Sequence, residues 1–132
     1  MSSPVNAVIA PAGIAPPAAN YAHAVATAGA GRWLHTSGVV PVAPDGTVPA
    51  GVAAQAEVIW TNIGAMLAEA GMGPADVVSV TTYVTPGQPL AEVMAARDRF
   101  LAGHRAASTL LVVPELAQPV WLLEIQVIAA AA

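Results

Sequence analysis

The strongest constraint on the fold is a change of hydrophobic period between two neighbouring segments. From residue 52 to residue 72 apolar side chains recur at helical spacing and form one broad stripe. The stripe comprises Val52, Ala56, Ile59, Ile63, Met66, Leu67 and Ala70. Glycines at 71 and 73 and a proline at 74 are typical of a helix end. The next segment, 77–84, reads VVSVTTYV and predicts a central strand because it is rich in β-branched residues.

The rest of the chain supplies a second helix and further strands. Helical spacing returns over 89–103, where Arg97, Asp98 and Arg99 are expected on a solvated face. Strands are predicted over the segments 5–17 (a short edge strand followed by an irregular loop), 32–37, 109–113 and 121–129. Asp45-Gly46 is a strong hairpin signal, so two antiparallel strands are expected to meet within 41–50. The resulting order predicts one α+β domain over 1–132, with two helices on one face of a mixed sheet.

The low charge of the chain indicates that it self-associates. Its 132 residues fit one domain, and 56% of them are apolar whereas only 9% are charged, against roughly 25% in an average soluble protein. A lone monomer of this composition is expected to expose apolar patches that subunit contacts would cover. Polar residues and prolines break each apolar stretch before the roughly 18 to 20 residues that span a membrane, so no membrane partner is expected.

Several classes of chemistry and partner are excluded by residues that the chain lacks. The net charge of −4 and the scattered basic residues argue against a nucleic-acid partner. The chain has no cysteine or lysine, which excludes thiolate and side-chain Schiff-base chemistry. The three histidines show no metal-site spacing, and we expect neither a metal nor a cofactor. Residues 1–15 lack a secretory signal, so a cytoplasmic location is expected.

Glu124 is the first candidate catalytic residue, because it interrupts an apolar strand. A carboxylate buried there without a partner costs several kcal/mol. Glu124 and Gln126 lie two apart and share one face of the strand, while Leu123 and Ile125 point the other way. One interpretation is a solvated face, or a carboxylate that satisfies a neighbouring N–H. The other is a general base or water-holding carboxylate in a cleft.

His35, Ser37 and Gly38 form the second candidate group, at the end of an expected strand. His35 and Ser37 lie two apart and are expected on one face. A nucleophilic pair is a weak hypothesis because no orienting carboxylate is identifiable, and the stronger one is that the pair lines a pocket. His23 and His104 are expected at the surface or in an interface.

Six segments stand in a distinctive order along nearly the whole chain. They are YAHAV (21–25), TSG (36–38), PVAPDGTVPA (41–50), the helical segment 52–71 with Gln55, Asn62-Ile63 and Ala70-Gly71, DVVSVTTYV (76–84) and LEIQVIA (123–129). In this order and spacing they resemble the RidA/YjgF family. The resemblance implies a chorismate-mutase-like α+β fold and a homotrimer whose sheets form an inner barrel with the helices outside.

The same resemblance implies a chemistry and a set of site residues. Typical members hydrolyse reactive enamines or imines of 2-oxo acids in clefts between subunits, without a cofactor. The resemblance makes Glu124 the residue that helps to hold the attacking water, and it places Tyr21, Ser37 and Gly38 in the pocket lining.

The chain departs from the family pattern at the residues that would grip a carboxylate. Ser108 stands where the family carries its arginine, Val39 replaces a glutamine, and Met94 replaces an asparagine. Arg105 lies three residues upstream and can substitute only if the chain bulges there. Loss of a bidentate pair with a carboxylate costs several kcal/mol in a desolvated site, so we expect a substrate other than a 2-imino acid.

Two hypotheses follow for the function. The first is an enzyme that uses Glu124, with His35 as an added acid or base, for imine or enamine hydrolysis, hydration or retro-aldol-type cleavage of a small molecule. Tyr21, Ser37, Gly38, Val39, Met94 and Ser108 would then bind the substrate. The second is a non-catalytic or regulatory trimer that binds a small ligand in the same clefts.

Overall fold

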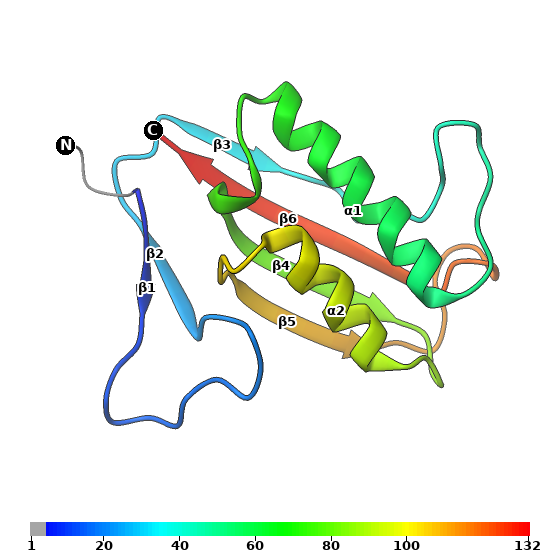
Figure 1. The fold of residues 1–132 in the computed structure, drawn as a ribbon, viewed down its shortest axis with the longest axis horizontal. Helices are drawn as coiled ribbons and strands as arrows, with labels where there is room; N and C mark the ends of the chain where they lie inside the picture. The colour runs from blue at the N-terminus through cyan, green and yellow to red at the C-terminus, as the bar shows by residue number, and fades with distance from the viewer. Residues whose placement is uncertain (1–4) are drawn as a thin grey trace.

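Two helices cover one face of a four-stranded mixed sheet in the computed structural model, which describes residues 5–132 (Figure 1). The sheet has the order β3-β6-β4-β5, in which β4 and β5 are parallel and the other pairs antiparallel. Its strands are β3 (Arg32–His35), β4 (Val77–Val84), β5 (Ala107–Val112) and β6 (Leu123–Ala131). The helices are α1 (Val52–Glu69) and α2 (Leu90–Leu101), and a 3-10 turn, η1 (Pro74–Asp76), precedes β4. The predicted α+β architecture is confirmed.

The core forms between α1 and the helix-facing side of β6. Leu123, Ile125 and Val127 are fully buried there, and they pack against the apolar stripe of α1. Burial of each such side chain contributes roughly 1.5 to 3 kcal/mol. Glu124 and Gln126 are only half-buried and lie on the opposite face of the sheet, as the alternation predicts.

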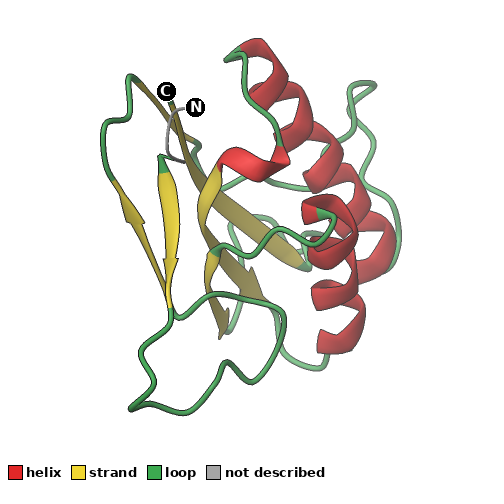
Figure 2. Ribbon diagram, turned by 60° about the vertical axis from the view of Figure 1, so that its left-hand side comes forward, coloured by secondary structure: helices red, strands yellow, loops and turns green. Residues whose placement is uncertain are grey.

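A small separate hairpin lies on the side of the sheet away from the helices (Figure 2). It consists of β1 (Asn6–Ile9) and β2 (Ala24–Thr27), paired antiparallel. The short strand expected within 5–17 is therefore present as β1, whereas β2 was not predicted. The four residues of β2, AVAT, are too few and too small to give a strand signal.

The prediction of two strands within 41–50 is wrong, although the chain does turn there. The Asp45 carboxylate accepts hydrogen bonds from the Thr47 backbone N–H (3.0 Å) and hydroxyl (2.7 Å). These bonds lower the pKa of the Asp45 carboxyl. No strand forms in this segment. Three prolines, Pro41, Pro44 and Pro49, remove backbone donors that strand pairing needs.

Among residues 5–132, no helix combines the length and the apolar composition needed to span a membrane. The N-terminal segment 1–15, in which no secretory signal was expected, falls partly on residues 1–4, which lie outside the described residues.

Candidate active site

Glu124 and Gly38 are brought together by an irregular extension of β3. Thr36 makes two hydrogen bonds with Val127 of β6. Its backbone N–H donates to the Val127 carbonyl (3.0 Å), and its hydroxyl accepts from the Val127 N–H (2.9 Å). Val39 then exchanges two backbone bonds with Ile125, of 2.7 and 3.1 Å. From Thr36 to Val39 the loop segment spans three residues, whereas the paired stretch of β6, from Val127 to Ile125, spans two. The loop segment therefore contains one extra residue, as in a β-bulge. Sequence reasoning missed the anchoring role of Thr36.

The Glu124 side chain lies over the backbone of Gly38. A Cβ atom at position 38 would stand 2.7 Å from Glu124 Cδ and would overlap Oε2, so a side chain at position 38 requires the carboxylate to move. Across residues 5–132 the Glu124 carboxylate makes no hydrogen bond or ion pair. The carboxylate is therefore available to accept a proton or to hold water.

His35, Ser37, Gly38 and Val39 line one cavity of about 460 Å³. Its remaining lining residues are Leu34, Thr36, Val40, Val42, Asn62 and Met66. The Asn62 amide donates to the Val42 carbonyl (3.0 Å), which ties the loop after β3 to α1. The strand ends at His35, two residues before the predicted end, so Ser37 lies in the loop. The cavity extends to Asn62 and Met66 of α1, whereas Glu124 lies on the face of the sheet away from the helices and does not line it.

His35 lies on the same face of the sheet as Glu124. It stands opposite Ile128, which shares the face of Glu124 on β6. Its ring is exposed and stacks on Trp33, with ring centroids 6.1 Å apart. A carboxylate and an imidazole are thus presented on one open side of the sheet.

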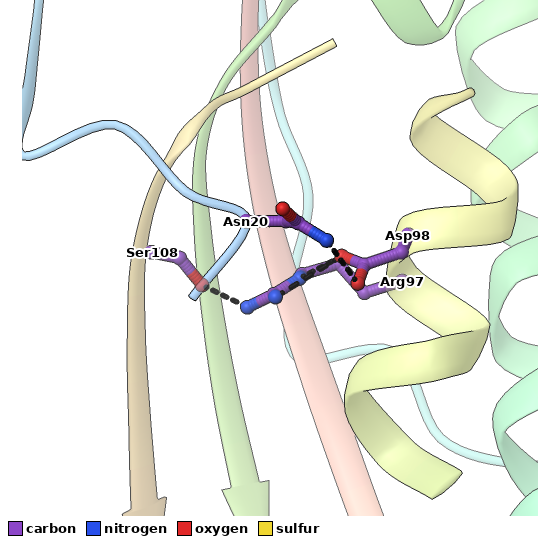
Figure 3. A network of polar contacts seen from close by, with 4 residues as sticks. All are labelled: Asn20, Arg97, Asp98 and Ser108. Atoms are coloured by element: carbon purple, nitrogen blue, oxygen red, sulfur yellow. Dashed lines mark hydrogen bonds and ion pairs between the residues drawn. The ribbon is translucent and has the colours of Figure 1, made fainter. Parts of the chain in front are cut away.

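Ser108 lies at the other edge of the sheet and on the opposite face from Glu124. It stands across from Val80, whose other neighbour is the buried Val127, so Ser108 faces the helices. Arg97 of α2 donates from Nη1 to the Ser108 hydroxyl (3.2 Å), as Figure 3 shows. A guanidinium from the helix therefore reaches the strand position at which the resemblance expects an arginine.

Arg97 is 6% exposed, so the prediction that it lies on a solvated face is wrong. Its Nε donates to Asp98 Oδ1 (3.1 Å), and Nη2 stands at ion-pair distance from the same oxygen (3.1 Å) without forming a hydrogen bond. Asp98 Oδ2 in turn accepts from the Asn20 amide (3.1 Å), as Figure 3 shows. Burial of the guanidinium is tolerated because Asp98 compensates its charge.

Tyr21 and Met94 lie on the Ser108 side of the molecule. Met94 is half-buried and precedes Arg97 by three residues on α2, so the two share a helix face. Tyr21 precedes Ala22, whose backbone N–H donates a hydrogen bond to the Ala106 carbonyl (3.0 Å). This bond holds the segment around Tyr21 next to the start of β5. The predicted site residues therefore form two groups, one around Glu124 and one around Ser108, with β4 between β6 and β5.

Arg105 does not move into the position of Ser108. β5 pairs with β4 from Ala107 to Val112 without a register shift, so Arg105 stays three residues upstream and outside the strand. It is exposed. Among the residues that the structure describes, no three histidine, aspartate or glutamate side chains gather as a metal site requires.

Comparisons with known proteins agree with this architecture. A family model described as endoribonuclease L-PSP matches residues 13–131. The crystal structure of YyfB from Yersinia pestis, a protein of the conserved Rid family, has a TM-score of 0.87 at 34% identity and covers 96% of this chain and 99% of that one.

Two curated relatives are similar in sequence. The 2-iminobutanoate/2-iminopropanoate deaminase of Escherichia coli K12 is 39% identical over 77 residues, which are 58% of this chain and 60% of that protein. A RutC family protein of Haemophilus influenzae is 37% identical over 101 residues, which are 76% of this chain and 72% of that protein. The match to the deaminase thus spans less than two thirds of its length, whereas the family model matches nearly all of this chain. The chain therefore belongs to the endoribonuclease L-PSP family, that is, the RidA/YjgF family.

Proposed function

We propose that this protein is a cofactor-independent enzyme that hydrolyses or cleaves a small imine, enamine or hydroxycarbonyl compound with water and the Glu124 carboxylate. The observation that carries the proposal is the unpaired Glu124 carboxylate held over Gly38 on the face of the sheet away from the helices. Relatives named as reactive intermediate deaminases support a small-molecule reaction of this class.

The chemistry follows from the unpaired Glu124 carboxylate. In imine hydrolysis, Glu124 takes a proton from water while the water oxygen bonds to the imine carbon, and it passes this proton to the imine nitrogen. Glu124 then takes the proton of the new hydroxyl group and gives it to the nitrogen as the carbon–nitrogen bond breaks. His35 stands opposite Ile128, four residues or roughly 13 Å along β6 from Glu124, so within one chain it is too far away to share these transfers. The products are a carbonyl compound and ammonia or an amine. In a retro-aldol-type cleavage, Glu124 takes the hydroxyl proton as the carbon–carbon bond breaks and returns it to the carbon that leaves as an enolate.

We further propose that the complete cleft forms between subunits of a homotrimer. In one chain Ser108 lies on the edge strand β5 and faces the helices, whereas Glu124 lies on the inner strand β6 and faces the other way, so one chain alone does not join them. The face that carries Glu124 also exposes Trp33 (51%) and Leu111 (40%). Contact through this face covers apolar surface and brings the β5 edge of one sheet towards the Glu124 group of the next.

The charges around Ser108 favour a substrate without a carboxylate. The guanidinium that reaches Ser108 is already paired with Asp98, so it offers no uncompensated positive charge. Val39 and Met94 add apolar surface where the family pattern has amides. A substrate carboxylate would lose its water shell at this position without gaining a free cation.

The arginines do not form the cluster of available cations that nucleic acid needs, although the family description names an endoribonuclease. Arg32 donates to the carbonyls of Ala70 and Gly71 at the end of α1, Arg97 is buried, and Arg99 pairs with Glu57. Only Arg105 remains free of such contacts within the described chain. A phosphate backbone needs a cluster of available cations, so we propose no nucleic-acid partner.

The test is an activity panel on the purified protein and on Glu124→Gln. We expect turnover of uncharged imines, enamines or β-hydroxycarbonyl compounds, little turnover of 2-iminopropanoate, and a loss of roughly 100-fold or more in Glu124→Gln. Efficient turnover of 2-iminopropanoate by the wild-type protein would contradict the proposed substrate class. Unchanged turnover in Glu124→Gln would contradict the role of the carboxylate.

A second candidate function is a non-catalytic trimer that binds a small ligand. It is favoured by the mainly apolar and backbone lining of the cavity beside Gly38. In that case the whole panel shows no turnover, and Glu124→Ala leaves every biological effect of the protein intact.

A further inference from the structure

A second cavity, of about 280 Å³, lies at the C-terminal end of α2. It is lined by Asn20, Asp98, Gly103, His104 and Arg105. None of these residues belongs to the group around Glu124. Its size fits a metabolite, since pockets for drug-sized ligands run from about 300 to 1,000 Å³.

Part of the lining of this cavity is fixed by the ion pair between Arg97 and Asp98. Asp98 is one third exposed and is held on one oxygen by Arg97 and on the other by Asn20 (Figure 3). Arg97 is itself anchored to Ser108. A carboxylate held at both oxygens is pre-organised, so ligand binding does not have to pay for ordering it.

The end of the helix forms another part of the cavity lining. α2 closes with left-handed backbone at Ala102 (φ 48°) and Gly103 (φ 89°), and the His104 N–H donates to the Leu101 carbonyl (2.9 Å). The His104 ring bonds the Val77 carbonyl through Nε2 (2.7 Å). A carbonyl only accepts, so Nε2 carries the proton and Nδ1 of the neutral ring is an acceptor.

The charges in the cavity are unequal. Arg97 compensates Asp98, whereas the exposed Arg105 makes no hydrogen bond or ion pair with any residue from 5 to 132. The cavity therefore combines one free guanidinium with acceptors on Asp98 and His104. The Asn20 side-chain carbonyl is a further acceptor, because the Asn20 amide nitrogen already donates to Asp98.

We propose that this cavity binds a small amino acid, with its carboxylate on Arg105 and its ammonium on the acceptor atoms of Asp98, Asn20 and His104. The planar guanidinium matches a carboxylate with two parallel hydrogen bonds, and an ammonium supplies three donors for these acceptors. This inference concerns binding alone and does not rest on the proposed reaction.

The first experiment is calorimetric titration of the full-length protein with L-alanine, propionate and L-alaninamide. Alanine carries both charged groups, propionate lacks the ammonium, and alaninamide lacks the carboxylate. We expect a Kd for alanine of roughly millimolar order and at least tenfold weaker binding of the other two. The absence of alanine binding, or equal binding of all three probes, would overturn the proposal.

Variants locate the site. Arg105→Met removes an exposed guanidinium and is expected to raise the Kd for alanine at least tenfold, whereas Arg105→Lys retains part of the affinity. Arg99→Met is the matched control, because Arg99 is an exposed arginine of α2 outside the cavity, and it should bind alanine like wild type. Glu124→Gln should also bind alanine unchanged. Wild-type affinity in Arg105→Met, or lost affinity in Glu124→Gln, would place alanine elsewhere and refute the assignment.

Discussion

The carboxylate of Glu124 lies over the backbone of Gly38, next to the two hydrogen bonds that join Val39 to Ile125. This contact places an ionisable group from the last strand beside the loop that follows β3. It exists because position 38 has no side chain.

Gly38→Ala is therefore expected to damage the site. The new methyl group overlaps the Glu124 carboxylate, which must leave its position, and turnover of the active substrate should fall at least tenfold. Steady-state kinetics measures the loss. Gly13→Ala is the control, because no atom lies within 4 Å of a Cβ at position 13, and it should retain wild-type kinetics. Wild-type kinetics in Gly38→Ala would contradict the assigned geometry.

Thr36→Val is expected to lower the free energy of unfolding by about 1 to 3 kcal/mol. The substitution leaves the buried Val127 N–H without the hydroxyl that accepts its hydrogen bond. Urea denaturation measures the change, and Thr36→Ser, which keeps the hydroxyl, should lose less stability. Unchanged stability in Thr36→Val would show that the hydrogen bond to the Thr36 hydroxyl does not stabilise the fold.

Arg97→Met is expected to destabilise the fold more than Ser108→Ala does. The first variant leaves the partly exposed Asp98 without its counter-ion and costs about 1 to 3 kcal/mol, whereas the second removes one hydrogen bond and costs about 1 kcal/mol. Both are measured by urea denaturation at neutral pH. A smaller loss in Arg97→Met than in Ser108→Ala would refute the structural role of the ion pair.

Trp33→Glu is expected to dissociate the proposed trimer. It puts a charge on the exposed apolar face of the sheet, and analytical ultracentrifugation should show wild-type trimers and smaller species for the variant. Leu90→Glu changes an exposed apolar residue of α2, on the helix side, and should remain trimeric. A trimeric Trp33→Glu protein would exclude this face as the subunit contact.

Local pattern was sufficient for the main helices and strands. Three patterns extend over many residues: the apolar stripe of α1, the β-branched run of β4 and the alternation around Glu124. In each of them the residues that the pattern predicts to be buried do pack into the core, so local preference and tertiary packing agree. Short or proline-containing segments were misjudged. Asp45-Gly46 makes a turn without strands, and the four residues of β2 carry no signal of their own.

The sequence by itself determined the α+β class, the family resemblance and the face on which Glu124 lies, because these depend on spacing along the chain. Tertiary structure alone decided which of these residues meet. The order β3-β6-β4-β5 places Gly38 under Glu124 and sends Ser108 to the other edge. It also buries Arg97, since a long side chain reaches Ser108 only once α2 packs on the sheet, and Asp98 then offsets the cost of desolvating its charge.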